Sequence, residues 1–275
     1  MRNIKLTLAY DGTDFSGWQI QPGQPTIQGA LTDALEKLTQ HRPAIYGAGR
    51  TDAGVHAAGQ VANFKTESPI SAPDFQRALN ALLPPSIRVL ASQEIAENFH
   101  ARWHAVAKTY RYRIFRGDVV PPSIWRYVCH YPHPLDFDAM AEAALRFKGE
   151  HDFTTFAATT GSEEQDRERS PIRIIYRSEI VRCAQRDSMA PGDEWEYIVR
   201  GKSFLRYMVR KMVGTLVEVG RGRLAPKDIP ALFALRDGSK SGATMPPQGL
   251  CMVEVEHQIP AEPVGHADAF SNSSH

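Results

Sequence analysis

Three ionisable side chains, Arg50, Asp52 and His56, lie in a segment of mostly small residues, GAGRTDAGVHAAGQVANF, at 47–64. Arg50 precedes Asp52 by two positions, so an extended chain would place both on one face, where the guanidinium favours an ionised carboxylate. An ionised, unhindered carboxylate can act as a nucleophile or a general base. A structural ion pair in a tight turn fits the same spacing, so both interpretations stay open.

The glycines of this segment suggest a reason for its small side chains. Gly47, Gly49 and Gly54 permit backbone angles and close approaches that a Cβ would hinder. We therefore interpret the segment as a place where a flat ligand can come close to Asp52. His56 is either an acid–base group or a side chain packed behind the segment.

The charged residues are unevenly distributed along the chain. The formal net charge is only +1, which by itself argues against a nucleic-acid partner. Residues 99–126, however, contain six Lys or Arg against one acid, and residues 200–223 contain seven against one. Two basic segments in a nearly neutral chain predict a one-sided positive surface suited to RNA. The alternative is two solvated faces without a ligand.

Membrane, disulfide and metal chemistry are not indicated. No apolar run approaches the roughly 18 residues of a membrane span, and the N-terminal residues lack the apolar core of a signal peptide. Cys129, Cys183 and Cys251 are far apart and odd in number, so we expect no disulfide framework and a cytoplasmic location. His130 and His133 lie close to Cys129, but the neighbouring prolines favour a surface loop over a metal site.

Periodicity assigns the candidate residues to strands and helices. In the first half we expect a strand over 5–10, a helix after the N-cap Thr26, a strand over 60–64, a helix over 73–83 and a strand over 87–95. In the second half we expect a strand through 109–114, a helix from Asp136 or Asp138 to Gly149, strands over 173–183 and 194–204, and a helix over 204–220. Asp11 and Asp14 are typical turn residues.

This order of elements predicts the α+β class, with two related lobes whose mainly antiparallel sheets carry helices on one face. We place the N-terminal lobe, which carries the Asp52 segment, at 1–105 and the C-terminal lobe at 106–257. The segment 159–171 is polar and charged, and the tail 258–275 lacks apolar periodicity. We expect the segment to be loosely ordered and the tail to be disordered.

The segment GRTDAGVHAAGQVANF resembles the signature motif of the tRNA pseudouridine synthase A family. Further segments follow the order and spacing of that family across residues 4–256: LAYDGTDFSGWQ, TIQGALTDAL, LNALLPPSIRV, FHARWHAVAKTYRYRI, DFTTF, FLRYMVRKMVGTLVEVG and GLCMVEV. A long motif with companions in register is far more specific than a lone glycine pattern. The resemblance implies RRM-like (ferredoxin-like) lobes joined around a central RNA-binding cleft, a homodimer, and no cofactor or metal.

Enzymes of this family cleave the N1–C1′ bond of a uridine in RNA, turn the detached uracil and rejoin it through C5. The resemblance therefore implies an isomerase that acts on uridines of the tRNA anticodon stem-loop, at tRNA positions 38–40. Because the free base must be held throughout, we expect stacking and edge hydrogen bonds rather than a covalent tether to the base.

The motifs also imply roles for particular residues. Asp52 matches the catalytic nucleophile, and Tyr110, on the apolar face of its predicted strand, matches the tyrosine that stacks on the target base. Arg210 matches the arginine that pairs with the catalytic carboxylate, whereas Arg206 on the same predicted helix would reach phosphate or solvent. Arg50 belongs to the active-site loop and would contact RNA backbone or a flipped-out base.

Arg102 and His104 match, in FHARWH, a loop that meets tRNA in the family, so we expect both to contact the RNA backbone. Two other functions compete: a non-catalytic RNA-binding module, and a glycoside hydrolase that uses Asp52. A hydrolase normally uses two carboxylates, and no convincing second one is present. A binding module does not need the Arg50–Asp52 motif, so the sequence favours the isomerase.

Overall fold

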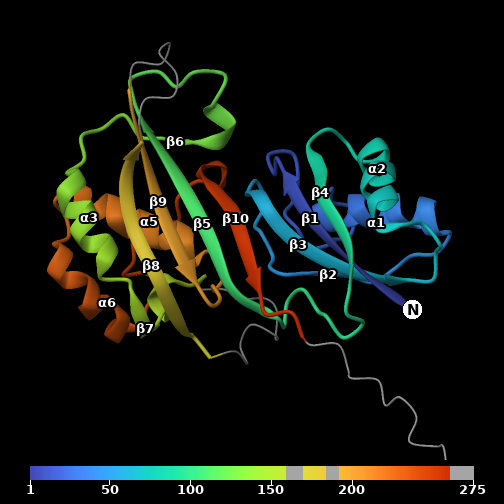
Figure 1. The fold of residues 1–275 in the computed structure, drawn as a ribbon. Coiled ribbons are helices and arrows are strands. Elements are labelled where there is room, and N and C mark those ends of the chain that lie inside the picture. Colours follow the sequence, from blue (N-terminus) through green and yellow to red (C-terminus); the bar gives the residue numbers. More distant parts are fainter. Residues whose placement is uncertain (159–169, 184–191, 261–275) are drawn as a thin grey trace, which may run out of the picture.

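The computed structural model describes residues 1–158, 170–183 and 192–260 (Figure 1). The strands in these ranges are β1 (Arg2–Tyr10), β2 (Ile45–Gly47), β3 (His56–Thr66), β4 (Ile87–Ile95), β5 (Ala105–Arg116), β6 (Cys129–His130), β7 (Gly149–Asp152), β8 (Ile172–Cys183), β9 (Asp193–Gly201) and β10 (Leu250–His257). The α-helices are α1 (Ile27–Thr39), α2 (Ala72–Leu82), α3 (Phe137–Leu145), α5 (Met208–Gly220) and α6 (Ile229–Leu235). Most of the predicted loose segment and of the predicted tail, 159–169 and 261–275, lies outside the described residues.

The described strands form one continuous sheet, in the order β4-β1-β3-β10-β5-β9-β8-β7, with β2 paired to β3 and β6 paired to β5. The last strand, β10, lies between β3 and β5 and so connects the two halves of the chain (Figure 1). It is parallel to β3 and antiparallel to β5. The mixed α+β class and the mainly antiparallel sheet are confirmed. The division into lobes at 1–105 and 106–257 stays a prediction.

The strand register aligns four side chains across the middle of the sheet. Tyr10 on β1 pairs with Ala57 on β3, Ala57 with Met252 on β10, and Met252 with Tyr110 on β5. Paired residues of neighbouring strands point to the same face, so these four side chains share one face. Tyr110 packs there against Phe204, just before α5. Helix α5 therefore lies on the face that carries the candidate base-stacking tyrosine.

The helices flank this region, with α1 and α2 over the strands of the first half and α3, α5 and α6 over those of the second (Figure 1). The Thr26 hydroxyl caps α1 as predicted, accepting from Gly29 N at 3.2 Å. Asp136 caps α3 in the same way, accepting from Ala139 N at 3.0 Å. No helix in the described part of the chain is long and apolar enough to cross a membrane.

Two predicted helix boundaries are wrong, the first of them because of a backbone angle that a right-handed helix cannot contain. Helix α5 begins at Met208 rather than at 204, because Tyr207 has φ 62° and lies in the left-handed region. Helix α3 ends at Leu145, and Gly149, with φ 116°, begins β7 instead. The strand predicted over 194–204 ends at Gly201.

Candidate active site

Asp52 lies in the turn between β2 and β3, and its carboxylate faces a guanidinium from α5. Arg210 Nη1 donates to Asp52 Oδ2 at 3.2 Å, which joins residues 158 positions apart in the chain. The turn is closed by Val55 N, which donates to Asp52 O at 3.1 Å, and Gly54 supplies a left-handed φ of 76°. The Asp52 side chain is 25% exposed, so a substrate atom can reach the carboxylate.

Arg210 is held in place by two further contacts. Its Nε donates to Met245 O at 2.6 Å, and its Cζ lies 4.9 Å from the centre of the Tyr207 ring. Arg206 contacts the same ring, with its Cζ at 4.8 Å. Cation–π contacts of this kind contribute roughly 0.5–1 kcal/mol each, comparable with the cost of the left-handed Tyr207 backbone, roughly 1–2 kcal/mol. Sequence reasoning missed Tyr207, whose signal is an aromatic residue between two arginines in RYMVR.

Burial and nearby positive charge have opposite effects on the pKa of the Asp52 carboxylate. Burial raises the pKa of Asp52 above its ordinary value, and the Arg210 ion pair and the more distant charge of Arg206 limit that rise. The cations that act on the carboxylate thus come from α5 and the turn before it. The strand face expected to bring Arg50 beside Asp52 does not form, because residues 48–55 lie between β2 and β3. The role of Arg50, an exposed residue, stays a prediction.

Tyr110 lies on β5 close to this pair. The residue is 7% exposed, and its ring meets that of Phe204 edge-on, with ring centres 4.9 Å apart. Burial raises the pKa of its hydroxyl far above the ordinary value, and the Asp52 charge adds to this shift. Tyr110 and Asp52 are therefore near enough to interact electrostatically. Tyr112, two residues later, is fully buried and donates to Pro246 O at 2.8 Å, consistent with a packing role.

A buried network fixes the backbone that precedes Asp52. Gln60 on β3 is fully buried, and its amide donates to Gly49 O at 2.7 Å. The hydroxyls of Tyr10 and Thr51 are 2.9 Å apart, and Trp18 N donates to Thr51 O at 3.0 Å. Because buried polar groups rarely stay unpaired, these bonds hold the loop in one conformation. Sequence reasoning missed Gln60, although a glutamine inside an apolar strand is itself a signal.

The glycines of the motif are explained by packing within the protein. A Cβ on Gly47 would lie 2.6 Å from the ring of Trp18, which is buried. A Cβ on Gly54 would meet Pro247 at 2.9 Å, in addition to the strain of its positive φ. A Cβ on Gly49 would lie 3.0 Å from Met252 Cε. The close approach that we expected of a ligand is thus made by neighbouring segments of the chain.

The structure supports the second interpretation of His56, a side chain packed behind the segment. Its Nδ1 accepts from Gly12 N at 3.1 Å and lies 3.3 Å from Asp11 Oδ1, while its Nε2 lies 2.9 Å from Arg126 O. Burial lowers the pKa of the imidazole, and the Asp11 charge opposes this shift. Asp11 also accepts from Thr13 N at 3.0 Å, as expected of a turn aspartate. His56 therefore connects loops behind the motif.

The FHAR loop, residues 99–104, connects β4 to β5. His104 Nδ1 accepts from His100 N at 2.9 Å, so this face of the imidazole serves the loop itself. Arg102 is exposed at the tip. Trp103 is 78% exposed and stacks on His100, with ring centres 3.9 Å apart. The loop thus presents a guanidinium and an indole to solvent, and its contacts with RNA stay a prediction.

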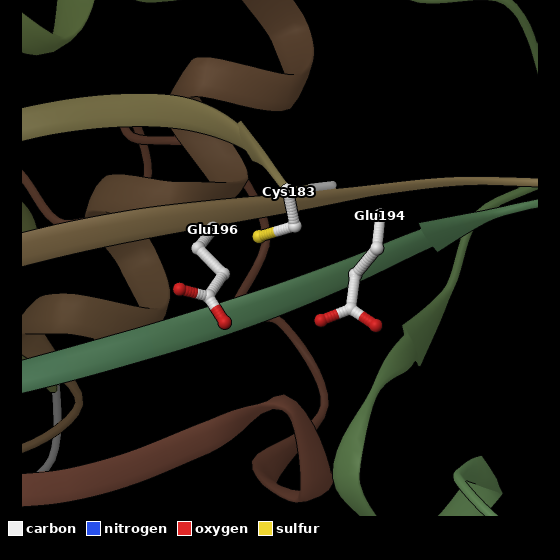
Figure 2. Close-up of side chains that lie close together, drawn as sticks. All are labelled: Cys183, Glu194 and Glu196. Atoms are coloured by element: carbon white, nitrogen blue, oxygen red, sulfur yellow. The ribbon is translucent and has the colours of Figure 1, made fainter. Parts of the chain in front are cut away.

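One group of potential metal ligands occurs in the described residues, on β8 and β9 (Figure 2). The ligand atoms of Cys183, Glu194 and Glu196 lie within 4.8 Å of one another. Arg113 binds both Glu194 oxygens at 2.7 and 2.8 Å, and Arg111 lies 3.6 Å from Glu196 Oε1. The arginines neutralise the carboxylates, and they alternate with Tyr110 and Tyr112 along β5, so the group lies on the face opposite Asp52. We interpret the group as an ion-pair cluster rather than a metal centre.

Comparison with known proteins identifies relatives that cover most of the chain. A family model described as "tRNA pseudouridine synthase" matches residues 7–104 and 143–258. The tRNA pseudouridine synthase A of Solibacter usitatus (strain Ellin6076) is 48% identical over 257 residues, covering 94% of this chain and 100% of that protein. The protein of the same name from Moorella thermoacetica (strain ATCC 39073 / JCM 9320) is 44% identical over 256 residues, covering 92% and 99%.

Solved structures give only a distant likeness. A chain titled "Crystal Structure of a Cbf5-Nop10-Gar1 Complex" is 13% identical with a TM-score of 0.32, covering 90% of this chain and 57% of that one. At this TM-score the likeness does not support an assignment, so the family of this chain is assigned from the sequence relatives. At this identity and coverage, the chain belongs to the tRNA pseudouridine synthase family.

Proposed function

We propose that this member of the family isomerises uridines of the tRNA anticodon stem-loop, with Asp52 as the catalytic carboxylate. The family and the relatives named tRNA pseudouridine synthase A support the enzyme class, an isomerase, and the tRNA substrate. The observation that carries the site assignment is the 3.2 Å ion pair between Asp52 and Arg210, close to Tyr110. A non-catalytic RNA-binding module has no use for a partly buried carboxylate held in this way.

The reaction places definite demands on these residues. The N1–C1′ bond breaks and the C5–C1′ bond forms, while C5 loses a proton and N1 gains one, so substrate and product are isomers. Asp52 acts at the sugar, either by attacking C1′ or by removing a ribose proton. Both routes need the ionised carboxylate. Since Arg210 occupies Oδ2, we assign the reaction at the sugar to Oδ1.

The proposal that the anticodon stem-loop is the substrate is tested by labelling the uracils of tRNA with tritium at C5 and measuring release of the tritium. We expect wild-type enzyme to release tritium from tRNA that carries uridines at positions 38–40. The same tRNA with cytidine at those positions, and uridine elsewhere, should release none. Release from the cytidine-substituted tRNA would refute the stem-loop assignment while leaving the synthase activity intact. Binding without release from either tRNA would favour the RNA-binding module.

Tyr110 is proposed to stack on the target base. Tyr110→Ala should lower kcat/KM roughly five- to 150-fold, since stacking on an aromatic side chain contributes about 1–3 kcal/mol per base. Tyr110→Phe should stay within a few-fold of wild type, because the hydroxyl has no hydrogen-bond partner among the described residues. Both variants are compared by tritium release after their melting temperatures are measured. If folded Tyr110→Ala matches wild type, the stacking role is wrong.

The remaining assignments rest on exposure and on the family. Arg50 and Arg102 are exposed and His104 is partly exposed, which suits contact with the RNA backbone. We propose a homodimer on the resemblance alone. We propose a cytoplasmic location because the three cysteines are odd in number and far apart in the sequence, and because tRNA is the substrate.

A further inference from the structure

Lys108 lies on the same face of β5 as Tyr110, two residues before it, and thus roughly 7 Å away along the strand. Its register neighbours are Val255 on β10 and Gly201 on β9. Its Nζ lies 3.3 Å from the point where a Cβ of Gly49 would stand. The ammonium group therefore adjoins the loop that carries Asp52, near the start of that loop, just after β2.

Lys108 is half-buried, and its ammonium group has no acidic partner among the described residues. Within the described residues, Lys108 makes no hydrogen bond or ion pair. Burial lowers its pKa to about 8, and the positive charges of Arg102 and Arg173 contribute to that shift. Arg102 comes from the FHAR loop and Arg173 from the start of β8, so cations from two other segments act on Lys108. An anion bound beside Lys108 would stabilise its ammonium group.

An unpartnered cation in a half-buried position lowers the stability of the folded protein, because the charge is desolvated and nothing compensates for it. Such a group suits a ligand that supplies the missing negative charge. RNA supplies negative charge through its phosphate oxygens. Within each nucleotide the ribose joins the base to a phosphate, so the two lie a short distance apart. A base stacked on Tyr110 would place a phosphate within reach of a cation two residues away on the same strand.

We propose that Lys108 is a positioning residue that binds a backbone phosphate of the target nucleotide or its neighbour, and so holds the nucleotide against Tyr110 and Asp52. This proposal rests on the proposed function of the site. Hydrogen bonds from an ammonium group to a phosphate are charge-assisted and stronger than hydrogen bonds between neutral groups. Lys108 binds the phosphate only when protonated, so its contribution is full at pH 7 and is lost as the pH rises. A bound phosphate raises its pKa, so the loss begins above pH 8.

The test compares Lys108→Gln with Lys108→Arg and with Lys5→Gln as a matched control. Lys5 is also a half-buried lysine of the sheet whose pKa burial lowers, but it lies on β1 and pairs with Asn63 on the opposite face. For each protein we would measure tRNA affinity at several salt concentrations, kcat and KM by tritium release, and the melting temperature without RNA. The affinity of wild type and Lys108→Gln would also be followed from pH 7 to 9.5.

We expect Lys108→Gln to bind tRNA about tenfold more weakly, with kcat within about threefold of wild type and KM increased. The slope of log affinity against log salt should fall by about 0.7–0.9, the value for one lost phosphate contact. Affinity should fall with rising pH in wild type only, and Lys108→Arg should restore the salt slope. Without RNA, Lys108→Gln should melt at the same or a higher temperature, since the uncompensated charge is gone.

Two results would overturn the proposal. An unchanged salt slope and affinity would show that no phosphate is bound, and a lower melting temperature without RNA would show that Lys108 has a structural role. Failure of the proposed function is seen separately, as absence of tritium release by wild type. In that case the salt slopes still report whether Lys108 contacts RNA.

Discussion

Replacing Asp52 with asparagine is expected to abolish pseudouridine formation while tRNA binding and folding stay close to wild type. Asparagine keeps the shape of the side chain and can still meet Arg210, but its amide neither attacks C1′ nor takes a ribose proton. Loss of a reacting group typically lowers kcat by about 10⁴-fold or more. Tritium release from C5-labelled tRNA measures turnover, and filter binding of the same tRNA measures affinity.

Asp14→Asn is the matched control, because it also removes one aspartate charge from the first half of the chain. Asp14 is 74% exposed and lies 3.5 Å from Arg126, so its loss should leave turnover within about twofold. Turnover by a folded Asp52→Asn enzyme at the wild-type rate would exclude both routes through this carboxylate. A parallel loss of tRNA binding and melting temperature would instead assign Asp52 a structural role.

The pH dependence of wild-type kcat/KM follows from the same group. Because burial raises the pKa of Asp52, the carboxylate becomes protonated at a higher pH than an ordinary aspartate, whose pKa is about 3.9. Only the ionised form reacts, so kcat/KM should fall as the pH falls through this raised pKa. The fall in activity on the acid side of the profile therefore occurs at a higher pH than an unperturbed aspartate would give. The same fall should be absent from any residual activity of Asp52→Asn.

Most elements were predictable because local patterns determine them. Alternation identified strands such as β1, and Thr26 marked the start of α1. The start of α5 was not predictable, since the left-handed Tyr207 depends on its contacts with Arg206 and Arg210 rather than on its own preferences. The place of β10 between β3 and β5 was also hidden, because pairing between distant strands leaves little trace in local periodicity.

The site shows the same division between local and long-range information. The motif and its companions identified Asp52, Tyr110 and Arg210 through the family resemblance, and the structure brings the first and last into contact. The two-residue spacing suggested that Arg50 lies beside Asp52, because residues two apart share a face of a strand, but residues 48–55 form no strand. Gln60 was missed because its role, a bond to Gly49 O, exists only after β3 lies beside the loop.

Removal of the Arg210 charge is the second large effect that we expect. Arg210→Gln should lower kcat at pH 7 about ten- to 150-fold, because a hydrogen bond to a charged group contributes roughly 1.5–3 kcal/mol. Without the guanidinium, burial acts on Asp52 unopposed by its strongest cation, so its pKa rises further. The acid limb of the kcat/KM profile should therefore move to higher pH, and part of the lost activity should return between pH 7 and 9. Steady-state tritium release across this range measures both effects.

Arg206→Gln is the control that separates charge from direct contact. Arg206 acts on Asp52 through its charge alone, whereas Arg210 also donates a hydrogen bond at 3.2 Å. Arg206→Gln should therefore move the acid limb in the same direction but by less, with kcat at its pH plateau nearly unchanged. Arg210→Gln should lower the plateau as well, since Oδ2 is no longer held and Oδ1 loses its aim at the sugar. An unmoved acid limb in Arg210→Gln would show that the ion pair does not control ionisation of Asp52, and its importance would then be structural.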